Sequence, residues 1–515
     1  MVFCFRKIDL LLIALVFTVS YGSQADLLKV YRKILPSRPL SLSPQRLEDQ
    51  YSVHLMRQTN FGLVTLGNDS RILGGLAKSW VLSRDKRKYT FVLRDDLKYS
   101  DGAPIRTVDV IHTFENLLSA ESLFSAEFAV IKGAAEYTKG LAKKISGIRI
   151  SGINTIEIEI VKPYPPFMAL LTSPQAGVLS REAIYKINSG KLLNIPSAGP
   201  YFINEVTEKN ILLKKNPYFW NKSSVYFDSI WYDVGIGRDE AIRGILTKKY
   251  DDIYPYSVPE DAAEKNGFQK ISTFSAFSWY IIFNLKRPHL NKLSFRQLLL
   301  DHFDYEAFLQ NVKMPAHLRA QGMIPMGCLG HTSKARVKSR GEIKISEMEL
   351  GCTVSSPCSV NILNPYPELQ NALELGFERL NKKFKAIKVE ISQVERQKWY
   401  SQFSAGDYQA TMVGNNLIYP DTFFLLKYLI DPRYHPGLNT KKISRLLEKS
   451  LLTDSHEERS GLFSEIDDEL LNQVGILPLY FGDMPHRYVS SRLAPFQVSI
   501  LGFPSLNIMH LREKK

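Results

Sequence analysis

Apolar and polar residues alternate in several short runs of the chain, which is the pattern of strands that are buried on one face. Every second residue is apolar in "YTFVL", residues 89–93, and in "IEIEI", residues 156–160. The stretch "GIRISGINTIEIEI" contains two such runs, and we expect a hairpin that turns around Ser151 to Asn154. Paired strands are therefore expected in the first half of the chain.

Helical periodicity fills segments between the predicted strands. Thr107 is placed to cap a helix whose first turn contains Asp109. A second helix is expected from Pro367 to about Lys383, and the strand "AIKVEI" follows it. The apolar faces of the two helices consist of Val110, Phe114 and Leu117, and of Leu369, Leu373, Phe377 and Leu380. These stripes predict core packing rather than a cofactor site, so we predict a mixed α/β protein.

Length and composition indicate a globular protein of two or three domains. The chain has 515 residues, of which 44% are hydrophobic and 23% are charged. It contains no heptad run, no short repeat and no long low-complexity segment. The domains are therefore expected to be joined by short crossings rather than by flexible linkers.

Residues 1–25 have the pattern of a secretory signal peptide, with cleavage expected after Ala25. Two basic residues precede an uncharged run at residues 10–19, and small and polar residues follow it. That run has about half of the roughly 20 apolar residues that a spanning helix needs, so an uncleaved anchor is the weaker alternative. Cys4 precedes the basic residues, whereas the lipid-bearing cysteine of an exported lipoprotein follows the apolar run. We therefore expect an exported, soluble protein without a lipid anchor, which in a bacterium means a periplasmic one.

Three cysteines remain after the expected cleavage. In an oxidising compartment Cys352 and Cys358 can close a small loop by a disulfide, which leaves Cys328 free. The alternative joins Cys328 and His331 to the later pair as a zinc site of mixed ligands. The spacing is loose and no repeated CxxC motif supports zinc, so we predict no bound metal.

The chain carries 66 basic and 52 acidic side chains, a net charge of +14. Such an excess indicates a nucleic-acid partner when basic residues gather and alternate with aromatic ones. The basic clusters of this chain, such as "SRDKRKY" and "NKKFKAIK", lie beside predicted strands and helices instead. We therefore expect a solvated basic surface and no nucleic-acid partner.

Local signatures of catalysis are absent from the sequence. It contains no GxSxG, HExxH or GxxxxGK motif and no GxGxxG after a predicted strand, and its ten histidines are scattered. Adjacent carboxylates such as Asp251 and Asp252 more often mark turns and solvated strand ends than an acid and base pair. We therefore predict a binding protein without a cofactor rather than an enzyme.

Several segments follow one another in the order of a known family. Residues 74–118 contain a "LAKSW" start, a "YTFVLR" strand, a "YSDGAP" turn and the capped helix. "SAGPYFINEVTEKNILLKKNPYFW", "YIIFNLKRPHLNKLSFRQLLLDHFDYEAF", "GMIPMG", "GDYQATMVG" and "VGILPLYFGD" come later in the same order. From Leu40 to the C-terminus, the chain resembles the family 5 extracellular solute-binding proteins, which are the receptors of peptide and nickel ABC importers.

The resemblance implies a periplasmic-binding-protein-like fold of two α/β lobes, two hinge crossings and a small domain inserted in the first lobe. The hinge residues are then expected at Phe283 and Asn284 and at Phe481 and Gly482. By position, the expected ranges are 26–66, 196–282 and 486–515 for lobe I, 67–195 for the inserted domain and 283–485 for lobe II. Such a receptor closes around its solute and docks on an inner-membrane permease, and we expect it to be a monomer.

The stretch "GNNLIYPDTFF", residues 414–424, resembles the ligand-binding loop of this family but lacks its usual charge. In peptide-binding members an aspartate four residues before the proline binds the α-ammonium of the ligand, and a tryptophan lies three residues further back. Counting back from Pro420 places Asn416 and Val413 at these two positions. An amide lacks the charge that binds an ammonium, so a ligand without a free amine is implied, to which Asn416 donates a hydrogen bond.

Further ligand contacts are expected in the same loop at Asn415, Tyr419 and Asp421. Asp421 is the one carboxylate of the loop, and in one alternative it replaces the missing aspartate. In a second alternative, Asn415 and Asn416 only complete a turn, as asparagine often does.

By the same resemblance, "SPQRLEDQY", residues 43–51, runs beside the ligand, which places Glu48, Gln50 and Tyr51 near the cleft. A plain surface strand is the alternative for these residues. No pattern identifies the arginine that holds a ligand carboxylate in some members, and Arg396 is a guess.

The sequence therefore predicts a periplasmic receptor of an ABC importer that binds a peptide-like or other polar organic solute. Within the same family a nickel or haem receptor is an alternative, although no compact His or Met cluster supports a metal. Two alternatives lie outside this function. One is a sensory protein that keeps the receptor fold but signals to a partner, and the other is an exported hydrolase.

Overall fold

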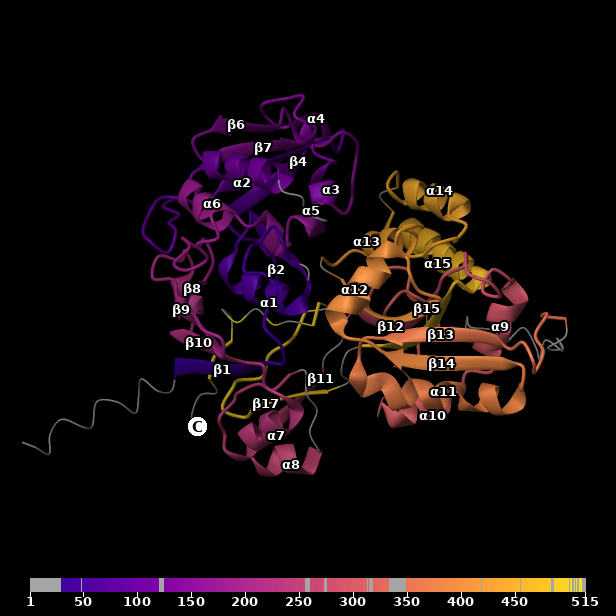
Figure 1. Cartoon of the computed structure of the whole chain (residues 1–515). Coiled ribbons are helices and arrows are strands. Elements are labelled where there is room, and N and C mark those ends of the chain that lie inside the picture. The colour runs from indigo at the N-terminus through magenta and orange to yellow at the C-terminus, as the bar shows by residue number, and fades with distance from the viewer. Residues whose placement is uncertain are drawn as a thin grey trace, which may run out of the picture.

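The structure of the chain is a computed structural model (Figure 1). It describes residues 29–511 except 48, 120–124, 255–259, 273–275, 313, 315–317, 333–348, 418, 454, 483–485, 500, 503, 505 and 507–508. The predicted signal peptide, residues 1–25, lies outside the described residues. Within them, no helix combines the length and the apolar character needed to cross a membrane.

Lobe I is built on two small sheets at the lower left of Figure 1. Its strands are β1 (Val30–Leu35), β8 (Tyr201–Val206), β9 (Asn210–Lys215), β10 (Ser229–Val234), β11 (Phe268–Ser272) and β17 (His486–Ser490), and its helices are α1 (Gln50–Thr59), α7 (Arg238–Leu246), α8 (Glu260–Lys265) and the 3-10 turn η3 (Lys222–Ser224). β1 pairs with β10 in parallel. β10 pairs with β9, and β9 with β8, both antiparallel. β11 pairs antiparallel with β17, and bridges at Asp252 join these two strands to β1.

The inserted domain lies above lobe I in Figure 1 and is built on an antiparallel sheet of order β4-β5-β7-β6. Its strands are β4 (Ala77–Leu82), β5 (Lys88–Leu93), β6 (Ile148–Gly152) and β7 (Thr155–Glu159), and its helices are α2 (Thr107–Ser119), α3 (Ser125–Phe128), α4 (Ala134–Thr138), α5 (Phe167–Leu170), α6 (Arg181–Asn188) and the 3-10 turn η2 (Pro174–Ala176). A short hairpin of β2 (Val64–Leu66) and β3 (Ile72–Gly74) precedes it. The alternating apolar residues of β5 and β7 are buried, because one face of the sheet packs on the helices.

Lobe II contains a mixed five-stranded sheet of order β14-β13-β15-β12-β16. Its strands are β12 (Phe277–Phe283), β13 (Cys358–Asn364), β14 (Ile387–Gln393), β15 (Ala410–Asn416) and β16 (Ile476–Phe481), and its helices are α9 (Leu293–Asp301), α10 (Tyr305–Asn311), η5 (Pro367–Leu369), α11 (Gln370–Lys383), α12 (Arg396–Ala405), α13 (Thr422–Leu429), α14 (Lys441–Ser450) and α15 (His456–Gln473). β12 pairs with β15 and β16, and all seven of its residues are buried. Helices lie both above and below this sheet in Figure 1.

The strands and helices expected from periodicity are confirmed, with differences at their ends. β5 and the hairpin of β6 and β7 lie where the alternation predicted them, and η5 with α11 spans the second predicted helix. α2 begins at Thr107, but Thr107 is its first helical residue rather than its cap. The Asp109 carboxylate instead accepts a hydrogen bond from the Arg106 backbone N–H at 2.9 Å, which satisfies a donor at the helix start.

The chain first crosses from lobe I to lobe II between Ser272, the last residue of β11, and Phe277, the first residue of β12. Lobe II therefore begins before Phe277 rather than at residue 283, because β12 is hydrogen-bonded within its sheet on both sides. Phe283 and Asn284, which we expected at the hinge, lie at the opposite end of β12. There the Asn284 side chain donates two hydrogen bonds to backbone carbonyls of lobe II.

The second change of sheet follows Phe481, the last residue of β16, and precedes β17. Gly482 has a φ of 87°, a conformation that favours glycine. Its N–H donates to the Phe277 carbonyl oxygen at 2.8 Å, next to the first change of sheet. Phe481 and Gly482 remain our predicted hinge residues on this side.

A buried network of charges holds three distant segments of lobe I together. Asp252 is fully buried and accepts hydrogen bonds from Lys33 Nζ at 2.8 Å, from Arg487 Nε at 3.1 Å and from the Tyr31 hydroxyl at 2.9 Å. Burial raises the pKa of Asp252, but the charges of Arg487 and Lys33 lower it more, so the pKa lies well below its usual value. Among the residues that the structure describes, this carboxylate is therefore the anion that pairs with both buried cations.

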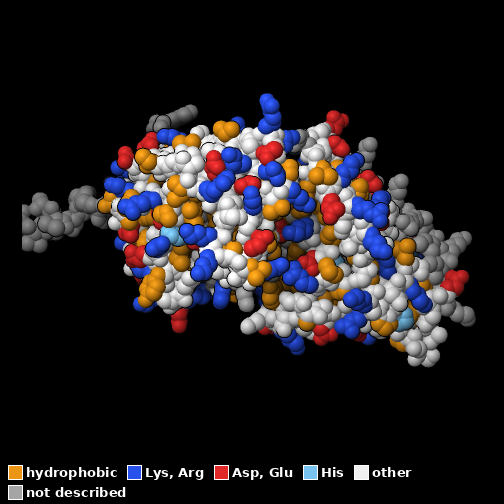
Figure 2. Space-filling model, turned by 90° about the horizontal axis from the view of Figure 1, so that it is seen from above, with side chains coloured by type: hydrophobic (Ala, Val, Ile, Leu, Met, Phe, Trp, Pro, Cys, Tyr) orange, Lys and Arg blue, Asp and Glu red, His pale blue; other side chains and the backbone are white. Residues whose placement is uncertain are grey.

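Basic and acidic side chains are mixed on the face of the molecule shown in Figure 2. On the face shown in Figure 2, Lys and Arg side chains are interspersed with Asp and Glu side chains and with apolar ones. The positive excess of the chain is therefore not gathered into a single patch on this face.

Candidate functional site

The loop that was expected to bind a ligand starts at the end of β15. Asn415 and Asn416 pair with Ser278 and Phe277 of β12, so both belong to a strand and the turn alternative is wrong. The Asn416 side chain leaves the sheet, and its Nδ2 donates to the Leu501 carbonyl oxygen at 3.0 Å. This bond joins lobe II to the C-terminal segment of the chain.

The C-terminal segment itself is bound to lobe I. The Leu506 N–H donates to Oε1 of Gln58, near the end of α1, at 3.3 Å. The Gly502 carbonyl accepts a hydrogen bond from Arg487 of the buried charge network. Asn416 therefore lies where the two lobes meet.

The Leu501 carbonyl fixes the orientation of the Asn416 amide, because only the NH₂ group can donate to it. Asn416 Oδ1 is buried and accepts no hydrogen bond from the residues that the structure describes. A buried acceptor without a donor costs about 1–3 kcal/mol. The sequence suggested that Asn416 donates to a ligand; in the structure one of its two N–H donors is engaged by Leu501, and Oδ1 is the side-chain atom without a partner among the described residues.

Asp421 is held by its own lobe. It is the N-cap of α13 and accepts a hydrogen bond from the Phe423 N–H at 2.8 Å, and Arg459 of α15 lies 3.4 Å from the same carboxylate. Burial raises the pKa of Asp421, although Arg459 and the Phe423 N–H lower it. These contacts engage the carboxylate that could have replaced the missing aspartate. Tyr419 is fully buried, with its ring centroid 4.9 Å from that of Phe424.

The inserted domain also touches lobe II at α13. Lys427 Nζ lies 2.6 Å from Oε1 of Glu127 in α3, and the ring of Phe423 meets that of Tyr164 edge to face at 5.6 Å. In Figure 1, α13 faces α3 and α5 of the inserted domain. Sequence reasoning missed all four residues, because nothing in the local pattern near Glu127 or Tyr164 indicates a partner so far along the chain.

Aromatic side chains surround the β15 strand on the lobe II side. The Tyr366 hydroxyl accepts a hydrogen bond from the Gly414 N–H at 3.2 Å, and the Trp279 ring meets the Tyr366 ring at 4.8 Å. Arg396, at the start of α12, lies over the Tyr366 ring at 5.9 Å. Arg396, which we guessed to bind a ligand carboxylate, therefore contacts the ring of Tyr366, and Tyr366 in turn contacts β15, the strand that carries Asn416.

The segment expected beside the ligand near the N-terminus is helical. Gln50 and Tyr51 form the first turn of α1, and Asp49 caps it by accepting hydrogen bonds from the N–H groups of Tyr51 and Ser52. The surface-strand alternative is therefore wrong. Gln50 is half-buried and Tyr51 is buried, whereas Glu48 lies outside the described residues.

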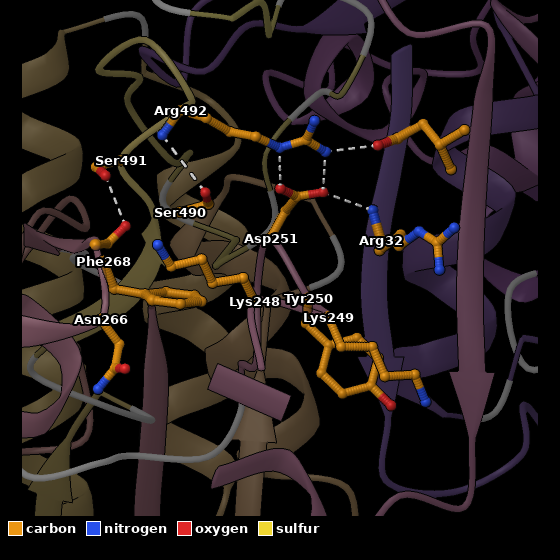
Figure 3. Close-up of a pocket in the computed structure, with 12 residues that line it drawn as sticks. Arg32, Lys248, Lys249, Tyr250, Asp251, Asn266, Phe268, Ser490, Ser491 and Arg492 are labelled. Carbon is orange, nitrogen blue, oxygen red and sulfur yellow. Dashed lines mark hydrogen bonds and ion pairs between the residues drawn. The ribbon is translucent and has the colours of Figure 1, made fainter. Parts of the chain in front are cut away.

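A separate cavity of about 390 Å³ lies within lobe I (Figure 3). Figure 3 shows Asp251 and Arg492 facing each other in its wall, and the Arg32 backbone N–H also donates to Asp251 at 2.9 Å. Asp251 and Asp252 were expected in a turn or at a solvated strand end, but both are buried in ion pairs with residues from distant parts of the chain. All the residues that line this cavity belong to lobe I, so it is distinct from the region around Asn416.

The cysteines lie in two parts of the core. Cys352 and Cys358 form a disulfide, as one of the two alternatives predicted, and Cys328 is free and buried. Cys328 packs in a different hydrophobic cluster, and His331 Nδ1 lies 2.8 Å from the Ile324 carbonyl oxygen. The mixed zinc site of Cys328 and His331 with the later pair is therefore not assembled.

Two α/β lobes, an inserted domain and a loop at the junction of the lobes define a periplasmic-binding-protein-like fold. The chain belongs to the bacterial extracellular solute-binding proteins, family 5, whose model matches residues 71–434. It is 22% identical over 486 residues to the periplasmic oligopeptide-binding protein of Escherichia coli K12, covering 88% of this chain and 86% of that protein. It is also 24% identical over 428 residues to the dipeptide-binding protein of the same organism, covering 77% and 78% of the two chains.

Solved structures of this fold superpose on most of the chain. Haemophilus influenzae OppA in complex with RPPGFSPFR has a TM-score of 0.80 and 16% identity, and covers 94% of this chain and 99% of its own. The Escherichia coli murein tripeptide binding protein MppA has a TM-score of 0.79 and 18% identity, with 95% and 99% covered. The fold predicted from the family resemblance is therefore confirmed.

Proposed function

We propose that the chain is the solute-binding component of an ABC importer, and that it captures a peptide-like solute between lobe I and lobe II. Its relatives include proteins named for binding oligopeptides and dipeptides. In this proposal the chain is exported, loses residues 1–25 and works as a periplasmic monomer without a lipid anchor. The closed, loaded form docks on an inner-membrane permease, and no chemical step on the solute is required.

The observation that carries this proposal is the state of the Asn416 amide. Its NH₂ group is bound to Leu501 across the junction of the lobes, and its Oδ1 is buried without a donor among the described residues. A ligand N–H placed there supplies the missing hydrogen bond and lies against both lobes at once. Because closure can be driven only by contacts that are better in the closed form, such a position favours closure on the solute.

We further propose that the solute is recognised without a tightly bound amine. Asn416 is neutral, and Asp421 is already engaged by Arg459 and by the start of α13. A hydrogen bond to a charged group contributes about 1.5–3 kcal/mol, whereas one between neutral groups contributes about 1 kcal/mol. Asn415, Tyr419, Gln50, Tyr51 and Glu48 are our candidates for the remaining contacts.

A panel of matched tripeptides tests this proposal. Each peptide is offered with a free amine and with an acetylated amine, and binding is measured as a rise in melting temperature and then by calorimetry. We expect at least one pair to stabilise the protein, with acetylation changing the affinity by less than about threefold. A loss of tenfold or more on acetylation would show that a carboxylate binds the amine after all. No stabilisation by any peptide would favour the sensory alternative.

A further inference from the structure

Two cysteines and a histidine that take no part in the proposed solute site lie together in lobe II. Cys358 begins β13 and forms a disulfide with Cys352, across the exposed loop 353–357. His289, in the turn between β12 and α9, places its Nδ1 3.3 Å from Cys358 Sγ. β13 runs parallel to β15, so this group lies at the opposite end of the sheet from Asn416.

Their three donor atoms are close enough to share one metal ion. The imidazole nitrogen and the two sulfurs all lie within 4.8 Å of one another, and this is the one such group of three His, Cys, Asp or Glu residues in the described part of the chain. In a tetrahedral zinc site, bonds of about 2.3 Å to sulfur and about 2.0–2.1 Å to nitrogen place the nitrogen and a sulfur about 3.5 Å apart. The observed separation of 3.3 Å between His289 and Cys358 is already near that value.

The protein holds His289 in this position from more than one side. The residue has a φ of 61°, its ring lies 5.8 Å from that of Phe295, and its carbonyl accepts a hydrogen bond from the Lys292 N–H at 3.0 Å. Histidine is more common than most residues at positive φ, but the conformation still requires support from its surroundings. The imidazole is half-buried, so an ion can reach it from solvent.

The two sulfurs can bind a metal only as thiolates, so the disulfide must first be reduced. A dithiol reductant supplies two electrons and two protons: the sulfur–sulfur bond breaks, two thiols form, and the reductant itself becomes a disulfide. Binding of a divalent ion then releases the two thiol protons. The sulfurs must separate to about 3.7 Å around a tetrahedral ion. The five residues between the two cysteines are exposed.

We propose that reduction converts the Cys352–Cys358 disulfide into a zinc site whose ligands are His289, Cys352 and Cys358. The site supplies two thiolates and one imidazole, a donor set that suits Zn²⁺, and leaves a fourth position for water. Zinc then holds the loop 353–357 closed in the reduced protein, as the disulfide does in the oxidised protein. The inference does not depend on which solute the receptor carries.

Cobalt binding to the reduced mature protein tests this inference. The protein is reduced with a dithiol, desalted without oxygen and titrated with Co²⁺, whose thiolate complexes absorb in the near ultraviolet and visible. We expect one Co²⁺ per chain in the reduced protein, displacement by one equivalent of Zn²⁺, and no such bands in the oxidised protein. Absence of the bands in reduced protein whose circular dichroism is unchanged would overturn the proposal.

Two variants separate this site from simple chelation by a pair of thiols. His289→Ala is expected to weaken Zn²⁺ binding at least about tenfold, whereas His456→Ala, at an exposed position in α15, is expected to change nothing. Unchanged binding in H289A would overturn the role of the histidine.

If reduction unfolds the chain, Cys352→Asp provides the second test, because it forms no disulfide and keeps three donor atoms. That variant is expected to bind Co²⁺ without reductant, and failure to do so would overturn the proposal.

Discussion

Replacing Asp252 by asparagine is expected to lower the free energy of unfolding by about 3–5 kcal/mol, because it leaves two buried cations without their anion. Lys33 and Arg487 both bind this carboxylate, and the three side chains are at most 2% exposed. Asparagine keeps the shape of the side chain but supplies no charge. The change is measured by guanidinium unfolding followed through tryptophan fluorescence.

Two controls identify the buried charge as the cause of that loss. Asp228→Asn removes the carboxylate of an exposed pair, 3.9 Å from Lys29, and is expected to cost less than about 1 kcal/mol. The triple change Lys33→Met, Asp252→Leu and Arg487→Met replaces the whole network by apolar side chains and is expected to recover most of the loss. If D252N is no more destabilising than D228N, the network does not hold lobe I together.

Replacing Asn416 by aspartate is expected to favour ligands with a free amine by about 10- to 150-fold over their acetylated forms. A carboxylate at this position restores the charge that an ammonium binds, which contributes about 1.5–3 kcal/mol. The ratio is measured by calorimetry with the peptide pair that binds best to the unchanged protein. The variant also loses the hydrogen bond to the Leu501 carbonyl, so its melting temperature without ligand is expected to fall.

An exposed amide in the same sheet provides the matched control. Gln393→Glu adds the same charge at the end of β14, the edge strand of the lobe II sheet, at a residue that is not proposed to contact the ligand. It is expected to leave the ratio of free to acetylated peptide unchanged. An equal gain from Q393E and N416D would mean that the added charge acts at long range, and that Asn416 does not face the ligand.

The local pattern of apolar residues was sufficient to predict the helices and strands, but not the distant residues that they contact. The alternation of β5 and β7 and the apolar stripe of α11 appear in the sequence because each element buries one face. The burial of Asp252 could not be predicted this way, since Lys33 and Arg487 lie 219 and 235 residues away. For the same reason, the ranges expected from the sequence wrongly divided β12 between the two lobes. The two strands that pair with β12 come from the second half of the chain.

The candidate site shows the same limit. Alignment with the family loop identified Asn416, but could not show that its NH₂ group donates to Leu501, 85 residues away. The role of Asp421 could be judged only from Arg459 of α15, which lies two helices further along the chain than α13. The charge missing from this loop was visible in the sequence, whereas the buried Oδ1 of Asn416, which has no partner among the described residues, became visible only in the fold.

Native mass spectrometry of the protein purified from the periplasm tests the central proposal most directly. The intact complex is weighed first, and denaturation then releases whatever it carries for identification. We expect one small peptide-like molecule per chain, which stays bound when its amine is acetylated. A protein that emerges without a bound molecule and gains none from a periplasmic extract would contradict the receptor function, and a bound molecule released by acetylation would contradict the role given to Asn416.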